Sequence, residues 1–284
     1  MSGPFGPYAE TMPGLLSLLR STHPAPTAAV TAIAVLLGAG IGLPAERVLL
    51  VGAVVLLNQF SIGLSNDAID AGRDRAANRA DKPVARGQLT PRNVMVVAVA
   101  CGALSLALAG IGGVGMLLAD AVLLTAGWLY NAGLKATVAS VVTYLVGFAA
   151  LPAIPTLAAP TPVAPVLWAV AAASLLGGAA HFANVLPDLE DDAEAGVRGL
   201  PQRLGRTRAT AVTVVLVLAA ATVIVAGAGV SAPLLVGLAL VVVLAAGVVV
   251  SARRDRSRLP FLLVMVAALV AVVMLLLAGG RVAG

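Results

Sequence analysis

Two segments of the chain carry asparagine and aspartate side chains at intervals of four residues. The first series is Asn66, Asp70 and Asp74, and the second, offset by 118 residues throughout, is Asn184, Asp188 and Asp192. On a helix, residues four apart lie on one face, so each segment presents a row of oxygen atoms. Glycine and basic residues follow each series, which places cationic side chains beside the oxygen atoms.

These two rows predict a site for metal ions and phosphate. Carboxylates so close together repel one another and are costly to desolvate at a membrane boundary. A divalent cation removes both problems, and an all-oxygen ligand set favours a hard ion such as Mg²⁺, which completes its shell with water and phosphate oxygens. The implied chemistry is a diphosphate bound through metal ions between two facing rows. The alternative, two solvated helix ends with internal charge pairs, is disfavoured because the pattern occurs twice.

The composition indicates where such a site must lie. The chain has 284 residues, of which 60% are hydrophobic and 11% are charged, and its mean hydropathy is +1.02. A soluble domain carries about 25% charged residues, so a soluble enzyme and a disordered chain are both excluded. A single cysteine, Cys101, excludes a disulfide scaffold. The elements that position the two rows are therefore expected to be membrane-spanning.

Apolar stretches long enough to cross a bilayer recur along the chain. A crossing helix needs about 20 mostly apolar residues, and these stretches lack the alternation of a barrel strand. Nine spans are predicted, at about 25–43, 47–65, 93–111, 114–131, 138–158, 164–184, 209–229, 232–250 and 259–279. The first residues, Met1 to Pro13, carry no positive charge and adjoin no apolar stretch, so a cleaved signal peptide is not expected.

The basic residues predict the orientation in the membrane. With nine spans, 16 of the 18 Lys and Arg residues fall on one side, and only Arg47 and Arg281 fall on the other. The positive-inside rule makes the first side cytoplasmic, so we expect a multi-pass protein of the cell membrane with its N-terminus inside and its C-terminus outside. Topology thus explains the net charge of +5, and no nucleic-acid partner is expected.

The motifs resemble those of the UbiA superfamily of intramembrane prenyltransferases. The resemblance rests on Asn66-Asp67-x-x-Asp70-x-x-x-Asp74, on Asp188-x-x-x-Asp192, on the stretch from Asp81 to Gly87, and on Tyr130 followed by Lys135. It covers nearly the whole chain, which we expect to form one domain, residues 1–284, with pseudo-repeat halves at about 24–135 and 138–258. The paired motifs are specific to the superfamily and not to one substrate.

The resemblance implies an all-α fold, with nine transmembrane helices in one bundle around a central cavity, capped on the cytoplasmic side by two Asp-rich loops. It implies Mg²⁺-dependent ionisation of an isoprenyl diphosphate donor inside the lipid bilayer. The implied metal ligands are Asn66, Asp70, Asp74, Asp188 and Asp192. The implied diphosphate contacts are Arg73, Lys82, Lys135 and Tyr130. Asp70, Asp188 and Lys135 are the expected catalytic residues.

Other residues have weaker assignments. Asn184 precedes the second motif by one step and is expected in the same site, whereas Asp67 and Asp191 lie off the face and can instead pair with arginines. His181 is a candidate base for the proton released by the acceptor, or a hydrogen-bonded histidine between helices. Asp120, inside a span, can bind an acceptor or a neighbouring helix. Arg20 can reach the diphosphate or simply anchor the first span.

Three functions fit these observations to different degrees. The first is transfer of an isoprenyl or polyprenyl group to an acceptor, with an aromatic ring as one candidate. The second is a membrane terpene cyclase, which uses the same ionising groups and no acceptor. The third is a transporter of an anionic substrate, but such sites lie near the bilayer midplane, whereas both rows here lie at one membrane face. The sequence leaves the acceptor and the donor chain length open.

Overall fold

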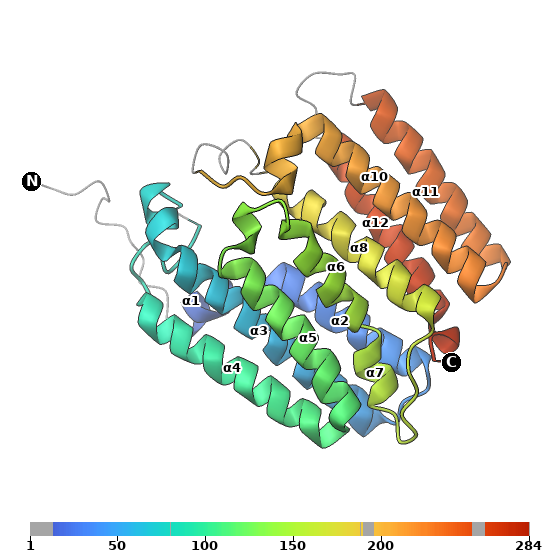
Figure 1. Cartoon of the computed structure of the whole chain (residues 1–284), viewed down its shortest axis with the longest axis horizontal. Helices are drawn as coiled ribbons and strands as arrows, with labels where there is room; N and C mark the ends of the chain where they lie inside the picture. The colour runs from blue at the N-terminus through green and yellow to red at the C-terminus, as the bar shows by residue number, and fades with distance from the viewer. Residues whose placement is uncertain (1–13, 80, 188, 190–195, 252–258, 284) are drawn as a thin grey trace, which may run out of the picture.

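The computed structural model describes residues 14–79, 81–187, 189, 196–251 and 259–283, and this part of the chain is predominantly helical (Figure 1). The elements are α1 (Gly14–Arg20), α2 (Pro24–Gly40), α3 (Ala45–Ala76), α4 (Pro91–Gly112), α5 (Val114–Asn131), η1 (Leu134–Ala136), α6 (Ser140–Ala150), α7 (Ala153–Leu157), α8 (Leu167–Val185), α10 (Leu200–Ala228), α11 (Ala232–Ser251), α12 (Leu259–Leu277) and η2 (Gly279–Arg281).

The predicted spans correspond to helices of the structure. Within the described residues, eight helical segments are long and apolar enough to cross a membrane, α6 and α7 together forming one of them. A ninth arises if α1 and α2 are counted as one broken span, bent by 66°. The bend falls at His23, which has a left-handed φ of 54° immediately before Pro24 begins α2. The predicted all-helical membrane bundle is therefore confirmed.

The helix ends differ from the predicted ones where polar residues continue a helix. α3 has 32 residues, and at 1.5 Å per residue it is about 48 Å long, well beyond a hydrocarbon core of about 30 Å. Hydropathy predicts its end near residue 65, but the helix continues through the first Asn/Asp series to Ala76. α10 likewise begins at Leu200 and is kinked at Gly205, whose φ of 76° is readily adopted only by glycine.

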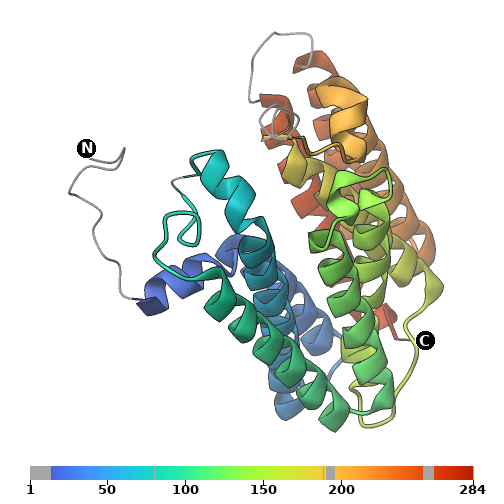
Figure 2. The same ribbon diagram turned by 60° about the vertical axis from the view of Figure 1, so that its left-hand side comes forward.

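Two groups of helices make up the bundle. α3 packs against α2, α4 and α5, and α8 packs against α6, α10 and α12 (Figures 1 and 2). Small residues permit these close approaches, as is common in membranes. A side chain at Gly63 of α3 would meet the backbone of Thr22, and one at Gly177 of α8 would meet Phe148 of α6. The site therefore rests on closely packed helices.

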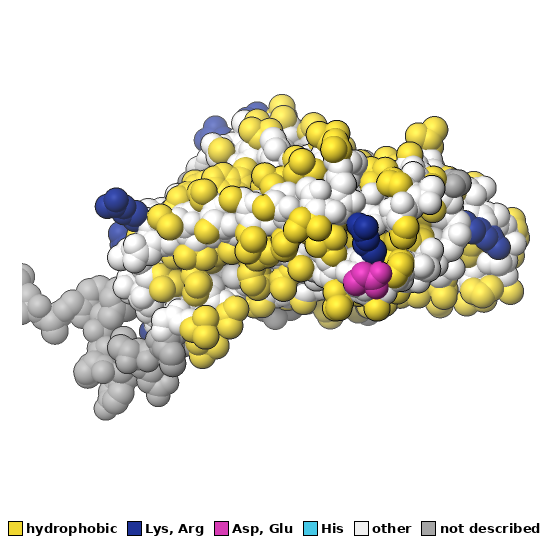
Figure 3. All heavy atoms as spheres, turned by 90° about the horizontal axis from the view of Figure 1, so that it is seen from below, with side chains coloured by type: hydrophobic (Ala, Val, Ile, Leu, Met, Phe, Trp, Pro, Cys, Tyr) yellow, Lys and Arg dark blue, Asp and Glu magenta, His cyan; other side chains and the backbone are white. Residues whose placement is uncertain are grey.

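The surface of the bundle suits lipid. Large hydrophobic side chains are exposed along most of the long helices, and examples are Val99, Leu118, Val146, Val243 and Leu269. Figure 3 shows one face on which hydrophobic side chains predominate and charged ones are few. Because lipid tails are as apolar as these side chains, such exposure is expected of a membrane protein.

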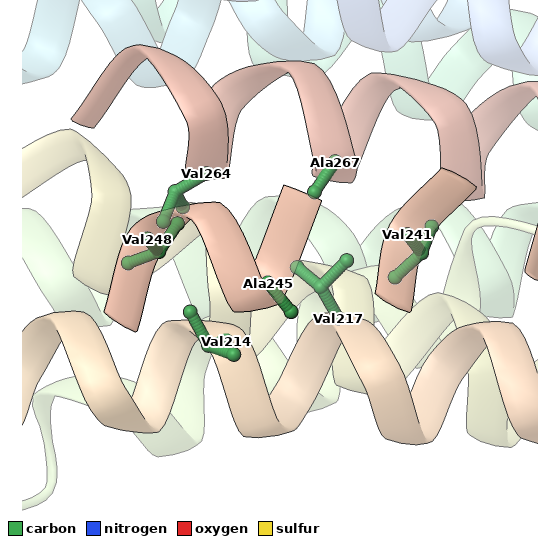
Figure 4. A pocket seen from close by; sticks show the side chains of 7 residues that line it. All are labelled: Val214, Val217, Val241, Ala245, Val248, Val264 and Ala267. Carbon is green, nitrogen blue, oxygen red and sulfur yellow. The ribbon is translucent and has the colours of Figure 1, made fainter. Parts of the chain in front are cut away.

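A small hollow lies among α10, α11 and α12 (Figure 4). Its volume is about 10 Å³, and its lining consists of valines and alanines only, among them Val217, Val241 and Ala267. A cavity of that size has room for about one water molecule. The hollow is therefore a packing defect between helices and not a binding site.

Candidate active site

The first row of oxygen atoms lies on the last turns of α3. Asp70 and Asp74 are each only 8% exposed, and Asn66 is partly buried one turn earlier. α3 is a regular helix throughout this stretch, so the spacing of four keeps all three side chains on neighbouring positions of one face. The connections 77–90 and 132–139 reach the same end of the bundle (Figure 1).

Asp70 is the centre of the strongest charge cluster of the site. Lys135 Nζ lies 2.5 Å from each carboxylate oxygen of Asp70. Arg73, one turn along α3, places a guanidinium nitrogen 2.6 Å from Asp70 Oδ1. The structure thus brings together three residues that the sequence analysis assigned to the metal and the diphosphate.

Lys135 is held in place by a short turn after α5. Gly133, with φ of 144°, redirects the chain into η1, which carries Lys135 toward α3. Burial lowers the pKa of the Lys135 ammonium, and the hydrogen bond and charge of Asp70 act in the opposite direction. The backbone at Gly199, just before α10, packs directly against the Lys135 carbonyl. Segments from both halves of the chain therefore meet at this lysine.

Asn66 pairs with a residue that the sequence analysis did not select. Its side-chain nitrogen donates to Asn131 Oδ1 at 3.0 Å. Asn131, 2% exposed at the end of α5, donates in turn to the Ile62 carbonyl at 2.8 Å and to Ser65 Oγ at 2.9 Å. Asn131 therefore fixes the α5 end, and with it η1, against the first row. Its position between Tyr130 and Lys135 was the only available sequence signal.

Lys82 contacts the same helix from the other connection. Its Nζ lies 2.6 Å from Asp67 Oδ1 and 3.6 Å from Asp74 Oδ2. Asp67, 2% exposed, also accepts a contact of 2.9 Å from His23 Nε2. Among the described residues, Asp67 thus pairs with a lysine and a histidine, and its pairing with an arginine stays a prediction. His23 had no signal in the sequence beyond its place before Pro24.

The donor chemistry of the first row fits a hard cation. Asn66, Asp70 and Asp74 offer only oxygen ligands along one face, as Mg²⁺ prefers. Asp74 Oδ2 is buried and, among the described residues, has no hydrogen-bond partner; only the ammonium of Lys82, 3.6 Å away, lies beside it, so its lone pairs can still bind a metal ion. No cluster of three or more acidic, histidine or cysteine groups with metal-binding geometry occurs in the described part of the chain. The expected partners Asp188 and Asp192 lie outside it.

The second row can be located only at its edges. Asp188, Asp191 and Asp192 lie outside the described residues, so their predicted roles stay predictions. Asn184 is exposed on the last turn of α8. Leu186, directly after α8, accepts a hydrogen bond of 3.0 Å from Arg206 of α10 through its carbonyl. The ends of α8 and α10 that flank the second row are therefore tied together.

A cluster of rings lies where α5, α6 and α8 meet near this end, with one ring from each helix. His181 is 1% exposed. The centroid of its ring lies 5.7 Å from that of Tyr130 and 4.9 Å from that of Tyr144. Its Nε2 lies 3.0 Å from Ser140 Oγ, which also accepts a hydrogen bond from the Leu200 backbone nitrogen. His181 therefore has the interhelical contact that the sequence analysis gave as one alternative. The Tyr130 ring belongs to this cluster.

Two further candidates lie away from Asp70. Asp120 of α5 is fully buried and hydrogen-bonds to Asn58 of α3 and Ser105 of α4, both at 2.7 Å. It therefore has the neighbouring helices as partners. Arg20 ends α1 and lines a pocket with His23 and Lys82.

Comparison with solved structures places this architecture among known folds. A UbiA homolog from Archaeoglobus fulgidus, solved with GPP and Mg²⁺, matches with a TM-score of 0.73 and 20% sequence identity, over 94% of this chain and 99% of that one. A digeranylgeranylglyceryl phosphate synthase matches with a TM-score of 0.68 and 14% sequence identity, over 95% of this chain and 100% of that one. The apo structure of a UbiA homolog from Aeropyrum pernix K1 matches with a TM-score of 0.67 and 19% sequence identity, over 94% of this chain and 98% of that one.

The sequence itself was compared in two ways. No curated protein matches the chain. A model of the UbiA prenyltransferase family matches residues 27–263, which include the described site from Asn66 to Lys135 and the second row. The match spans most of the chain and agrees with the fold, and the chain therefore belongs to the UbiA prenyltransferase family.

Proposed function

We propose that this protein transfers an isoprenyl or polyprenyl group from its diphosphate to an acceptor within the membrane, in a reaction that depends on Mg²⁺. The observation that carries the proposal is the cluster of Asp70, Arg73 and Lys135 beside the row of oxygen ligands on α3, in which the side chains of Asp70 and Lys135 are largely buried. Two cations on one carboxylate, at the boundary of a membrane bundle, suit the binding of a diphosphate and its metal ions.

The residues have separate roles in this proposal. Asn66, Asp70 and Asp74, with Asp188 and Asp192, would hold Mg²⁺, which supplies positive charge to the leaving diphosphate. Arg73, Lys82, Lys135 and Tyr130 are the proposed diphosphate contacts. Breaking an allylic C–O bond moves charge onto the diphosphate, so cations placed there in advance stabilise the transition state more than the ground state.

The membrane bundle supplies the second requirement. The allylic cation formed by ionisation reacts with water, so the reaction needs an apolar enclosure. We expect the apolar helices to supply it, so that a long prenyl chain remains among apolar side chains throughout. Tyr144 and Phe148, stacked with centroids 6.1 Å apart on α6, are candidates for stabilising a cation through their faces.

The test is a donor and acceptor screen with the purified protein. C10 to C50 prenyl diphosphates are incubated with Mg²⁺ and candidate acceptors, and diphosphate release and product mass are measured. Consumption of a donor in Mg²⁺ but not in EDTA supports the proposal, and an adduct mass identifies a transferase. An acceptor-free hydrocarbon would instead indicate a terpene cyclase.

Two variants of α3 test the role of Asp70, one at Asp70 itself and one at the other end of the helix as a control. Asp70→Asn keeps the shape of the side chain but removes its charge, and we expect diphosphate release to fall at least about 100-fold. Glu46→Gln changes an exposed acid in the first turn of α3, at the opposite end of the helix, and should leave the rate unchanged. No turnover of any donor by the folded wild-type protein would exclude the proposed function.

A further inference from the structure

The start of α10 is capped by a serine of another helix. The first backbone N–H groups of a helix have no partner within it, and the residue before the helix commonly supplies one through its side chain. Gly199, which precedes α10, has no side chain to do so. Instead, Oγ of Ser140, the first residue of α6, accepts a hydrogen bond of 3.2 Å from the Leu200 backbone nitrogen. The beginning of α10 is therefore held by α6.

Gly199 is required by a close approach and not by its backbone conformation. Its φ of −63° is open to any residue. A Cβ atom at this position would collide with the Lys135 carbonyl oxygen, and it would lie 3.4 Å from Ser140 Oγ. Because glycine has no side chain, the segment before α10 can lie directly on the turn that carries Lys135, and the capping of α10 is left to Ser140.

The same hydroxyl reaches a third helix. Ser140 Oγ lies 3.0 Å from Nε2 of His181 in α8. Both residues are buried, so neither polar group can turn to water if this contact is lost, and each would then carry a desolvation cost. A single serine therefore joins α6, α8 and α10.

Hydrogen bonds connect Ser140 to the turn of Lys135. The Ser140 backbone nitrogen donates to the Thr137 carbonyl at 3.2 Å. Thr137 Oγ1 in turn donates to the carbonyl of Leu134, the first residue of η1, at 2.8 Å. On its other side, η1 follows the end of α5, which Asn131 fixes against α3. The short turn with Lys135 is therefore anchored at both ends, and Ser140 is the anchor toward α8 and α10.

We propose that Ser140 is a positioning residue, which fixes the turn carrying Lys135 so that its ammonium is held on Asp70 before a diphosphate arrives. Ser140 acts through the backbones of η1 and α10. A cation that is already in place needs no reorganisation when charge develops on the leaving group, so loosening the turn should slow the chemical step. This effect on the rate rests on the proposed function, whereas the positioning of Lys135 can be measured without turnover.

Lysine labelling of the purified full-length protein in detergent tests the positioning. The chain has two lysines, Lys82 and Lys135, so limited acetylation followed by peptide mass spectrometry compares Lys135 with an internal reference. Ser140→Ala should raise the labelling rate of Lys135 about tenfold, as expected for local opening after loss of one buried hydrogen bond, and leave that of Lys82 unchanged. Hydrogen exchange at the Leu200 amide should also become faster. Unchanged labelling of Lys135 in a folded Ser140→Ala protein would overturn the proposal.

A second variant and a matched control accompany Ser140→Ala. Gly199→Ala keeps the serine hydroxyl but forces a methyl group against the Lys135 carbonyl, so it should also speed the labelling of Lys135, and no increase would count against the proposal. Ser174→Ala removes another hydroxyl between α8 and α6, which donates to the Leu145 carbonyl at 3.0 Å, and should change neither labelling nor exchange. Equal increases in Ser140→Ala and Ser174→Ala would show general loosening of the bundle and overturn a specific role for Ser140.

Steady-state kinetics connect the positioning to the reaction. With a donor that the wild-type protein consumes, Ser140→Ala should lower kcat about tenfold with little change in KM, because the turn is loosened and Lys135 itself is retained. Faster labelling of Lys135 with an unchanged kcat would show that its positioning does not limit the reaction, and would overturn the inference. No turnover by the wild-type protein would contradict the proposed function alone, and the labelling experiment would still decide whether Ser140 positions Lys135.

Discussion

Lys135 links the connection after α5 to the face of α3 that carries Asn66, Asp70 and Asp74. Its ammonium contacts both oxygens of Asp70 while buried, with a side chain only 10% exposed. A cation in that position neutralises Asp70, and in the proposed reaction it would contact the departing diphosphate. Its removal should therefore affect the transition state more than the bound donor.

The corresponding prediction concerns Lys135→Gln. We expect kcat for prenyl diphosphate consumption to fall about 100-fold with a smaller change in KM. Steady-state measurement of diphosphate release gives both constants. Arg47→Gln, a basic residue at the opposite end of the bundle, is the control and should behave as wild type. An equal loss in both variants, or an effect on KM alone, would contradict this role of Lys135.

The residues that the sequence predicted and those it missed differ in kind. Asn66, Asp70 and Asp74 could be found because a regular helix turns a spacing of four into a shared face. Asn131 and His23 could not, because their contacts with Asn66 and Asp67 arise where separate elements pack together. No periodicity marks such residues, and their partners are 65 and 44 positions away in sequence.

At the scale of elements, a buried polar network joins α3, α4 and α5. Ser105 Oγ of α4 lies 2.7 Å from Asp120 Oδ2 and 2.9 Å from the Val54 carbonyl of α3. Asn58 Nδ2 of α3 donates to Asp120 Oδ1 at 2.7 Å. Asn58, Ser105 and Asp120 are all fully buried, so each lost hydrogen bond would weaken the pairing of polar groups in an apolar environment.

This network predicts different outcomes for two changes at Asp120. Asp120→Asn retains an oxygen that can accept from Asn58 and adds an amide that can donate to Ser105, so stability should be nearly unchanged. Asp120→Leu removes the carboxylate that accepts from Asn58 and Ser105, which then keep only the backbone carbonyls of residues 120 and 54, and should lower the free energy of unfolding by about 1–2 kcal/mol. Thermal or denaturant unfolding in detergent measures both.

The matched control for Asp120 is on the same helix. Thr125→Val alters an exposed residue of α5 and should have little effect on unfolding. A strong loss of prenyl transfer in a stable Asp120→Asn protein would instead favour the acceptor-binding role that the sequence left open. Unchanged stability in Asp120→Leu would show that the network does not hold the three helices together.

The ends of helices were the least predictable part of the elements. Hydropathy locates the membrane-crossing part of α3, but it cannot show that the helix continues to Ala76, because the added residues are polar. Likewise, the fifth predicted span is divided between α6 and α7 around Pro152, which hydropathy alone does not reveal. The site depends on the extension of α3 to Ala76, since Asp67, Asp70 and Asp74 all lie on it.

At the scale of the whole molecule, the two ends of the bundle have different chemical character. The connections 77–90 and 132–139 carry the site and lie at one end, whereas residues 41–44 and 158–166 lie at the other (Figure 1). Of the 18 Lys and Arg residues, Arg47 and Arg281 belong to the second end. This asymmetry predicts that the site faces the cytoplasm, where Mg²⁺ and soluble diphosphates are available.

Cysteine labelling in intact bacterial cells tests this orientation. Cys101→Ala removes the single cysteine, and new cysteines are then introduced one at a time at exposed positions of the two ends, as Ala77→Cys and Thr161→Cys. A membrane-impermeant maleimide should label Thr161→Cys in intact cells and Ala77→Cys only after permeabilisation. Because the two positions are at opposite ends of one bundle, each serves as the other's control. The reverse pattern would place the phosphate-binding residues outside the cell, and the positive-inside interpretation of the charges would then be wrong.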